Sequence, residues 1–175
     1  MQPPTLTQDE VAQPVQKLKL PRIEHIGLRR FSLFTANPDA EFACSDGVLC
    51  LVGANGIGKS TLLAAINFCL TGVVADPNRT FESMEEYYKF TRSFSSNYFR
   101  GRISENDEDD AEITVRFRLG AYRYELKRGM FEPDELRGLS ISDISSGEAV
   151  PLKDEATRSE RHREYADKLV AHSGV

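Results

Sequence analysis

The sequence predicts an α/β fold in which a mixed sheet surrounds a strand–loop–helix unit, with an antiparallel β-hairpin region added to it. The apolar run "VLCLV" at 48–52 lacks polar alternation, as expected of a strand buried on both faces of a parallel or mixed sheet. A glycine-rich loop follows at 53–60, and apolar residues then recur at helical spacing. Residues 113–126 alternate with the period of a hairpin. The 175 residues suffice for one domain with an appendage.

Three regions are expected along the chain. Residues 1–20 carry Pro3, Pro4 and Pro14 among polar residues and are predicted to be a flexible extension. Residues 21–152 form the main lobe, beginning with a strand-like stretch at 22–34. A short strand follows at 40–44 and is closed by a turn at 45–47. Residues 153–175 are charged and expected to form a helical segment, a candidate root of a coiled coil.

Helical periodicity is clearest after the glycine loop. Apolar residues form one helix face that ends at Gly72: Leu62, Leu63, Ile66, Cys69 and Leu70. A second helical stretch, rich in aromatic residues, is expected within 81–100, followed by a solvated acidic loop at 105–110.

The hairpin is predicted with its register. A two-residue turn at Gly120-Ala121, with positive φ at its first position, joins the two strands. The apolar partners across the pair are Leu119 with Tyr122, Phe117 with Tyr124, and Val115 with Leu126. On the opposite, solvated face Arg118 lies across from Arg123 and Arg116 across from Glu125. A second, weaker hairpin is expected to join 139–144 and 149–152 through a turn at 145–148.

Apolar run lengths, cysteine content and net charge indicate the cellular compartment in which the protein is expected to work. No apolar run is long enough to span a bilayer, and no apolar stretch follows a basic start, so we expect neither a membrane span nor a secretory signal. The cysteines are Cys44, Cys50 and Cys69; they are odd in number and sit among apolar neighbours. We therefore expect buried free thiols in a reducing, cytoplasmic setting. The net charge of −5 gives no global reason to expect nucleic-acid binding.

The loop Gly53-Ala54-Asn55-Gly56-Ile57-Gly58-Lys59-Ser60 fits the phosphate-binding pattern G-x-x-x-x-G-K-[ST]. Backbone N–H groups at a helix N-terminus can hold a triphosphate, and glycines let the backbone approach it closely. Lys59 would reach the β- and γ-phosphates, Ser60 would ligate Mg²⁺, and Thr61 would donate toward the α-phosphate. The predicted ligands are therefore ATP and Mg²⁺. The predicted binding residues are Gly53, Asn55, Gly56, Ile57, Gly58, Lys59, Ser60 and Thr61.

These stretches resemble the N-terminal half of an SMC-type ATPase head, a P-loop NTPase lobe of the ABC/SMC head type. That group includes SMC, RecF-like and RecN-like proteins. Asn55 and Gly56 match the N-G of the family loop, and Phe31 matches the aromatic residue of its first strand. Arg30 departs from the usual asparagine, and Ser32-Leu33 replaces the usual basic-serine pair. The resemblance implies a second ATPase head or a C-terminal lobe as partner, with ATP-driven head dimerisation around DNA.

The resemblance also predicts motifs that this sequence lacks. All four glutamines (Gln2, Gln8, Gln13 and Gln16) precede the loop, so no Q-loop follows it. Neither a signature motif nor an apolar strand ending in Asp-Glu is found after the loop. We therefore expect a fragment or half-head with no catalytic residue of its own, which binds nucleotide but hydrolyses little alone.

Two other functions stay open. The chain could be the nucleotide-binding subunit of an ABC transporter, although such subunits usually place a glutamine soon after the loop. It could instead be a non-catalytic nucleotide-sensing module, which steady-state hydrolysis by the whole protein would distinguish. A basic cluster with interleaved aromatic residues at 87–102 suggests a DNA-facing patch, but nearby glutamates favour an ordinary charged surface over a small aromatic core.

Overall fold

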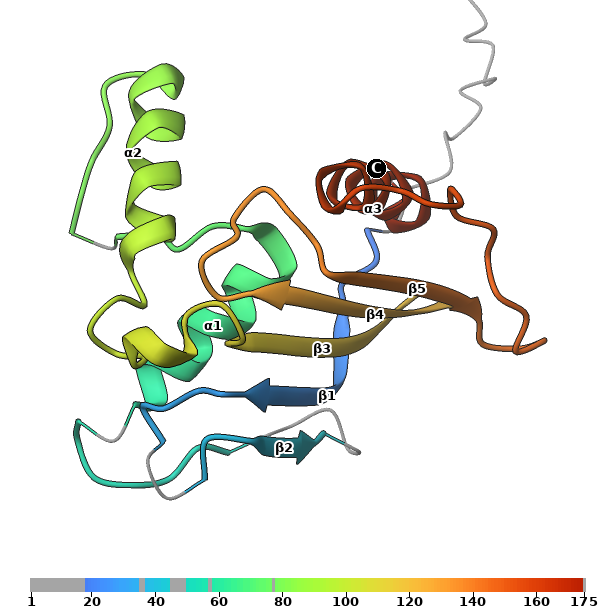
Figure 1. Cartoon of the computed structure of the whole chain (residues 1–175). Coiled ribbons are helices and arrows are strands. Elements are labelled where there is room, and N and C mark those ends of the chain that lie inside the picture. Colours follow the sequence, from blue (N-terminus) through green and yellow to red (C-terminus); the bar gives the residue numbers. More distant parts are fainter. Residues whose placement is uncertain (1–17, 35–36, 45–49, 57, 77, 175) are drawn as a thin grey trace, which may run out of the picture.

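The fold is built on a five-stranded sheet. The structure is a computed structural model that describes residues 18–34, 37–44, 50–56, 58–76 and 78–174. The strands are β1 (Arg22–Arg29), β2 (Ala40–Ala43), β3 (Glu112–Leu119), β4 (Tyr122–Gly129) and β5 (Gly138–Asp143). They lie in the order β2-β1-β3-β4-β5, and every neighbouring pair is antiparallel (Figure 1).

The prediction of a mixed sheet is therefore wrong, because the described sheet is antiparallel throughout. The central strand predicted at 48–52 is also wrong for residues 50–52, the part of that run that is described. Residues 48 and 49 lie outside the described residues, as does the turn predicted at 45–47. Cys50–Val52 form no strand, Cys50 is exposed rather than buried, and Val52 is 85% exposed. An apolar run becomes a strand only when a neighbour satisfies its N–H and C=O groups. None of the five described strands pairs with this segment.

The hairpin at 113–126 is confirmed in its register and its turn. β3 and β4 pair Leu119 with Tyr122, Phe117 with Tyr124 and Val115 with Leu126. Gly120 has a positive φ of 60° at the first turn position. Alternation of apolar and polar residues at period two thus fixes which face of this ribbon enters the core.

The second hairpin is shorter than predicted. β5 is followed by a turn in which the Gly147 N–H donates to the Asp143 carbonyl at 2.9 Å. The return segment pairs with β5 through a single bridge, Ser142 with Ala149, and the Val150 N–H donates to the Ile141 carbonyl at 2.8 Å.

Three α-helices accompany the sheet: α1 (Lys59–Thr71), α2 (Met84–Asn97) and α3 (Arg158–Ser173). α1 ends as predicted at Gly72, whose N–H donates to the Phe68 carbonyl. α3 begins at a capping box formed by Thr157 and Glu160. The acidic loop contains one turn of 3₁₀-helix, η1 (Glu105–Asp107). The aromatic-rich α2 projects away from the sheet (Figure 1).

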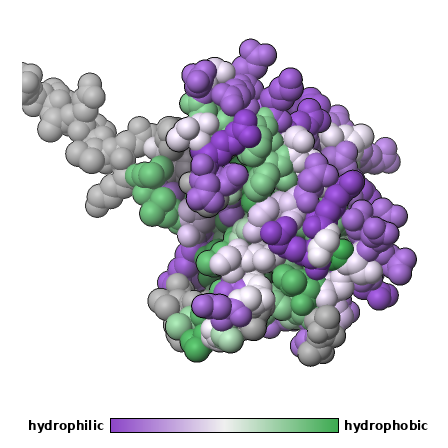
Figure 2. All heavy atoms as spheres, turned by 90° about the vertical axis from the view of Figure 1, so that its left-hand side faces the viewer, coloured by the Kyte–Doolittle hydropathy of each residue, from purple (hydrophilic) through white to green (hydrophobic). Residues whose placement is uncertain are grey.

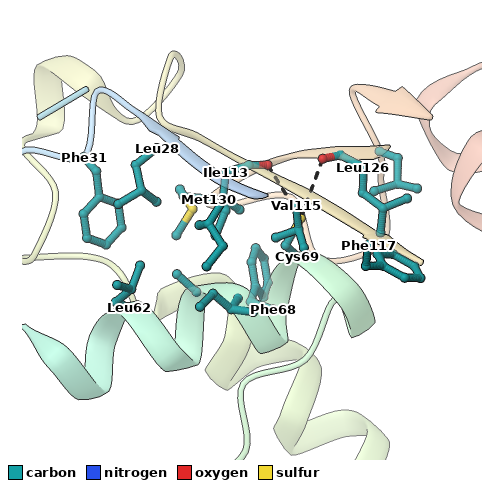
Figure 3. Packing of buried hydrophobic residues seen from close by; sticks show 14 of the residues in the cluster. Leu28, Phe31, Leu62, Phe68, Cys69, Ile113, Val115, Phe117, Leu126 and Met130 are labelled. Atoms are coloured by element: carbon teal, nitrogen blue, oxygen red, sulfur yellow. Dashed lines mark hydrogen bonds between the residues drawn. The ribbon is translucent and has the colours of Figure 1, made fainter. Parts of the chain in front are cut away.

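The core lies between one face of the sheet and the helices α1 and α3. Figure 3 shows Phe68 and Cys69 of α1 against Ile113 and Val115 of β3. Farther along the same face, Tyr165 of α3 packs edge-on against Tyr124 of β4. The other face of the sheet carries ion pairs: Arg116 with Glu125, and Glu24 with both Arg118 and Arg123. The fold is therefore two layers deep over the described residues.

Arg128 of β4 is a fully buried arginine that joins three elements at the far end of α1. Its guanidinium donates to the carbonyls of Cys69 at 3.1 Å, Pro133 at 2.5 Å and Glu135 at 2.9 Å, and it lies 3.1 Å from His162 Nδ1. These acceptors belong to α1, to the β4–β5 connection and to α3. Because a buried cation without acceptors is strongly unfavourable, this network determines how the three segments sit against one another.

The contact with Arg128 requires a neutral His162, and this makes folding pH-dependent. Burial, helped by the nearby positive charge of Arg128, lowers the pKa of His162 below its ordinary value of 6.5. The unfolded chain therefore binds this proton first as the pH falls. We predict that the unfolding free energy measured by denaturant titration decreases as the pH is lowered from about 7 to about 5.

The substitution His162→Gln removes the titrating group while keeping a hydrogen-bond acceptor for Arg128. The decrease should then be shallower, although it will not vanish, since burial also lowers the pKa of His172. An equally steep decrease in the variant would contradict this assignment.

Candidate functional site

The glycine loop lies between the segment Cys50–Val52 and the first turn of α1. Ile57, one of the predicted binding residues, lies outside the described residues. Beside the loop is an open pocket of about 300 Å³. Six of the predicted binding residues line it: Asn55, Gly56, Gly58, Lys59, Ser60 and Thr61. Gly53 is not among the lining residues, but its carbonyl contacts the Lys59 ammonium.

The first turn of α1 presents backbone donors to this pocket. Its N-cap is Gly58, which has no side chain with which to cap the helix, and the Leu62 N–H donates to the Gly58 carbonyl at 2.9 Å. By helix geometry the N–H groups of Lys59, Ser60 and Thr61 have no intrahelical acceptor. No acidic residue lies in this turn. The positive end of the helix dipole can therefore act on an anion in the pocket.

The Lys59 side chain folds back over the loop that precedes it. Its Nζ donates to the carbonyls of Gly53 and Ala54, both at 2.6 Å. An ammonium has three N–H donors, so one remains for a further acceptor. The two carbonyls hold the charge beside the pocket, where a phosphate oxygen would be a suitable third partner.

Gly56 and Gly58 both adopt left-handed backbone conformations, with φ of 86° and 93°. Their surroundings differ. A Cβ at Gly58 would lie 3.0 Å from Leu33 Cδ2 and 3.0 Å from Phe34 Cε1, whereas a Cβ at Gly56 would meet nothing within 4 Å. Gly58 is thus needed for packing as well as for conformation. Gly56 lines the pocket and has open space where a Cβ would lie.

The packing around Gly58 depends on an element that the sequence did not predict correctly. The strand expected over 22–34 ends at Arg29, because Arg30 has a φ of 53° and reverses the chain direction. The Arg30 N–H donates to Asp39 Oδ1 at 2.7 Å, which stabilises this bend. Phe31 then enters the core, with its ring 5.3 Å from that of Phe34. The bend places the 31–34 turn against the glycine loop.

The three Asp-Glu pairs that follow the glycine loop in the sequence lie in turns rather than at the end of a buried strand. Asp107-Glu108 lie at η1, Asp134-Glu135 in the β4–β5 connection and Asp154-Glu155 in the turn before α3. Among the residues that the structure describes, no group of three His, Cys, Asp or Glu side chains could hold a metal ion. The Ser60 hydroxyl stays the predicted Mg²⁺ ligand, and it lines the pocket.

The aromatic residues near α2 pack against one another. Phe90 and Phe94 stack with centroids 5.3 Å apart, and the Arg79 guanidinium lies 3.9 Å from the Phe90 centroid. Arg92 is paired with Asp134 at 2.8 Å. Figure 2 shows that this side of the molecule is mostly hydrophilic, with hydrophobic patches between the polar side chains. These contacts favour the expected charged surface over an aromatic cluster.

Gly58→Ala and Gly56→Ala form a matched pair for the loop. Both force a left-handed alanine, which costs about 1–2 kcal/mol. Only Gly58→Ala also pushes a Cβ against Leu33 and Phe34. We predict a larger loss of unfolding free energy for Gly58→Ala than for Gly56→Ala in denaturant titrations. Equal losses would show that the Gly58 contacts are unimportant.

Comparison with known proteins bears on the loop and the fold together. A family model described as an AAA domain matches residues 22–169, from the start of β1 into α3. No curated protein matches the chain. None of the described helices is long and apolar enough to cross a membrane. The family match spans most of the sequence and includes the glycine-rich loop. AAA domains of this family generally use ATP and Mg²⁺. The chain belongs to the AAA domain family of P-loop ATPases.

Proposed function

We propose that this chain is the ATP-binding N-terminal lobe of an SMC-like ATPase that acts in DNA maintenance or defence. One observation carries the proposal. Free backbone donors of α1, the Lys59 ammonium and the open space at Gly56 meet at a single pocket. The resemblance of "LRRFSLF" and of the G-x-N-G-x-G-K-S loop to SMC-type heads supports the finer assignment.

The residues present fit Mg-ATP. The N–H groups at the start of α1 and the third Lys59 donor would hold the phosphate oxygens. Thr61 would donate toward the α-phosphate, and Ser60 would contribute its hydroxyl to Mg²⁺. Mg²⁺ held there would supply positive charge that offsets part of the charge of the phosphates. With Gly56 lacking a Cβ, the loop backbone can approach the phosphates closely.

The proposed partner is a C-terminal lobe or a second ATPase head. The segment Cys50–Val52, in which Cys50 and Val52 are exposed, supports this choice, because it lines an apolar pocket of about 260 Å³ together with Phe34, Phe42 and Leu62. An apolar segment next to the glycine loop is well suited to pairing with a strand from such a partner. ATP held at the loop would then lie close to the contact between the two parts, and DNA is the proposed target of the assembly.

The proposal predicts a specific gain in stability. Mg-ATP at about a hundred times its Kd should raise the unfolding free energy by roughly 2.7 kcal/mol. Lys59→Ala should remove most of this gain, because the main cationic contact is lost. Lys89→Ala, which removes an exposed lysine of α2, is the matched control and should keep the full gain. Denaturant titration with and without Mg-ATP measures all three proteins.

Two results would count against nucleotide binding at this loop. The first is a wild-type protein whose stability does not change with Mg-ATP. The second is Lys59→Ala retaining the same gain as Lys89→Ala, which would place the nucleotide elsewhere on the molecule.

A further inference from the structure

Arg102 lines the same pocket as the glycine loop, although it lies more than forty positions farther along the chain. It follows α2 in a turn that also contains Gly101. Leu33 is the other lining residue that lies outside the glycine loop and the first turn of α1. The fold therefore brings a second cation to the pocket in which the phosphate tail is proposed to bind.

The turn that carries Arg102 is anchored on both sides. Phe99 is fully buried and Ile103 is 3% exposed. The Arg102 N–H donates to the Phe99 carbonyl at 3.0 Å, and the Ser104 N–H donates to Ser32 Oγ at 2.6 Å. Because Ser32 belongs to the turn that packs against Gly58, the two turns bordering the pocket are joined directly. Arg102 thus extends from a fixed backbone.

The Arg102 guanidinium is held by Tyr98 and is not neutralised by a carboxylate. It lies 4.3 Å from the centroid of the Tyr98 ring and donates to the Tyr98 carbonyl. Arg102 also lines an adjoining pocket together with Glu105 and Glu108, but the ion pairs found among the described residues include none between Arg102 and either carboxylate. By contrast, Arg30, three residues before Leu33, is paired with Asp107. Arg102 therefore lies beside the glycine loop without a carboxylate partner among the described residues.

We propose that Arg102 is a second cationic contact for the polyphosphate tail of the bound nucleotide. This inference rests on the proposed function. A guanidinium offers donors in a planar fork that fits two phosphate oxygens, whereas Lys59 acts as a point charge. Contact with Arg102 would place the tail between α1 and the turn after α2. The binding site thus includes a residue outside the sequence motif.

The test compares three variants by isothermal titration with Mg-ATP and with inorganic tripolyphosphate. Arg102→Ala should weaken binding of both ligands about tenfold or more, as expected for loss of a charged hydrogen bond. Arg102→Lys should recover part of the loss. Arg100→Ala is the matched control, because Arg100 is exposed and lines the adjoining pocket but not the pocket beside the glycine loop. It should stay within about twofold of the wild type. Melting curves without ligand should match for all variants.

The other possible outcomes show whether the inference about Arg102 fails alone or together with the proposed function. Wild-type binding that depends on Lys59 but is unaffected by Arg102→Ala would overturn the inference and leave the function standing. An effect on ATP but not on tripolyphosphate would also overturn it, because the contact would then be to the nucleoside. Absence of wild-type binding would overturn both. If Arg102→Ala lowers the melting temperature, Arg102→Gln, which keeps the long side chain, takes its place in the same comparison.

Discussion

The packing of α1 against one face of the antiparallel sheet is the contact on which the rest of the structure depends. Leu62, Phe68 and Cys69 bury one side of the helix against β1, β3 and β4. Apolar burial of this kind is the dominant favourable term in folding, and it fixes the helix axis. Once the axis is fixed, the free N–H groups of the first turn have one direction in which to bind an anion. The candidate site at the start of α1 thus depends on core packing along the rest of the helix.

Both ends of α1 are held by groups other than the apolar core. At its C-terminal end the buried Arg128 forms no ion pair with a carboxylate among the described residues and instead donates to carbonyls, including that of Cys69. At its N-terminal end Leu33 and Phe34 pack against Gly58.

The chain carries a net charge of −5, yet Lys59 and Arg102 give the pocket beside the glycine loop a positive local charge. Local placement of charge therefore outweighs the overall balance at short range.

Features set by neighbouring residues could be predicted from the sequence. The β3–β4 register follows from alternation and from Gly120, and the end of α1 follows from Gly72. Features set by distant residues could not. Burial of the 48–52 run needs a neighbouring strand that the described residues do not provide, and its residues Cys50 and Val52 are exposed. Arg102 joins the pocket only through the tertiary anchoring of Phe99 and Ile103, which leaves no periodic signal in the sequence.

The most direct test of the central claim follows the backbone amides of the loop by NMR while Mg-ATP is added. If the N–H groups at the start of α1 bind the phosphate tail, the resonances of Gly58, Lys59, Ser60 and Thr61 should shift together and saturate with one affinity. Amides in the middle of β4, which the core separates from the pocket, should stay in place. Unchanged loop resonances alongside bound nucleotide, or shifts centred on another part of the molecule, would contradict the account.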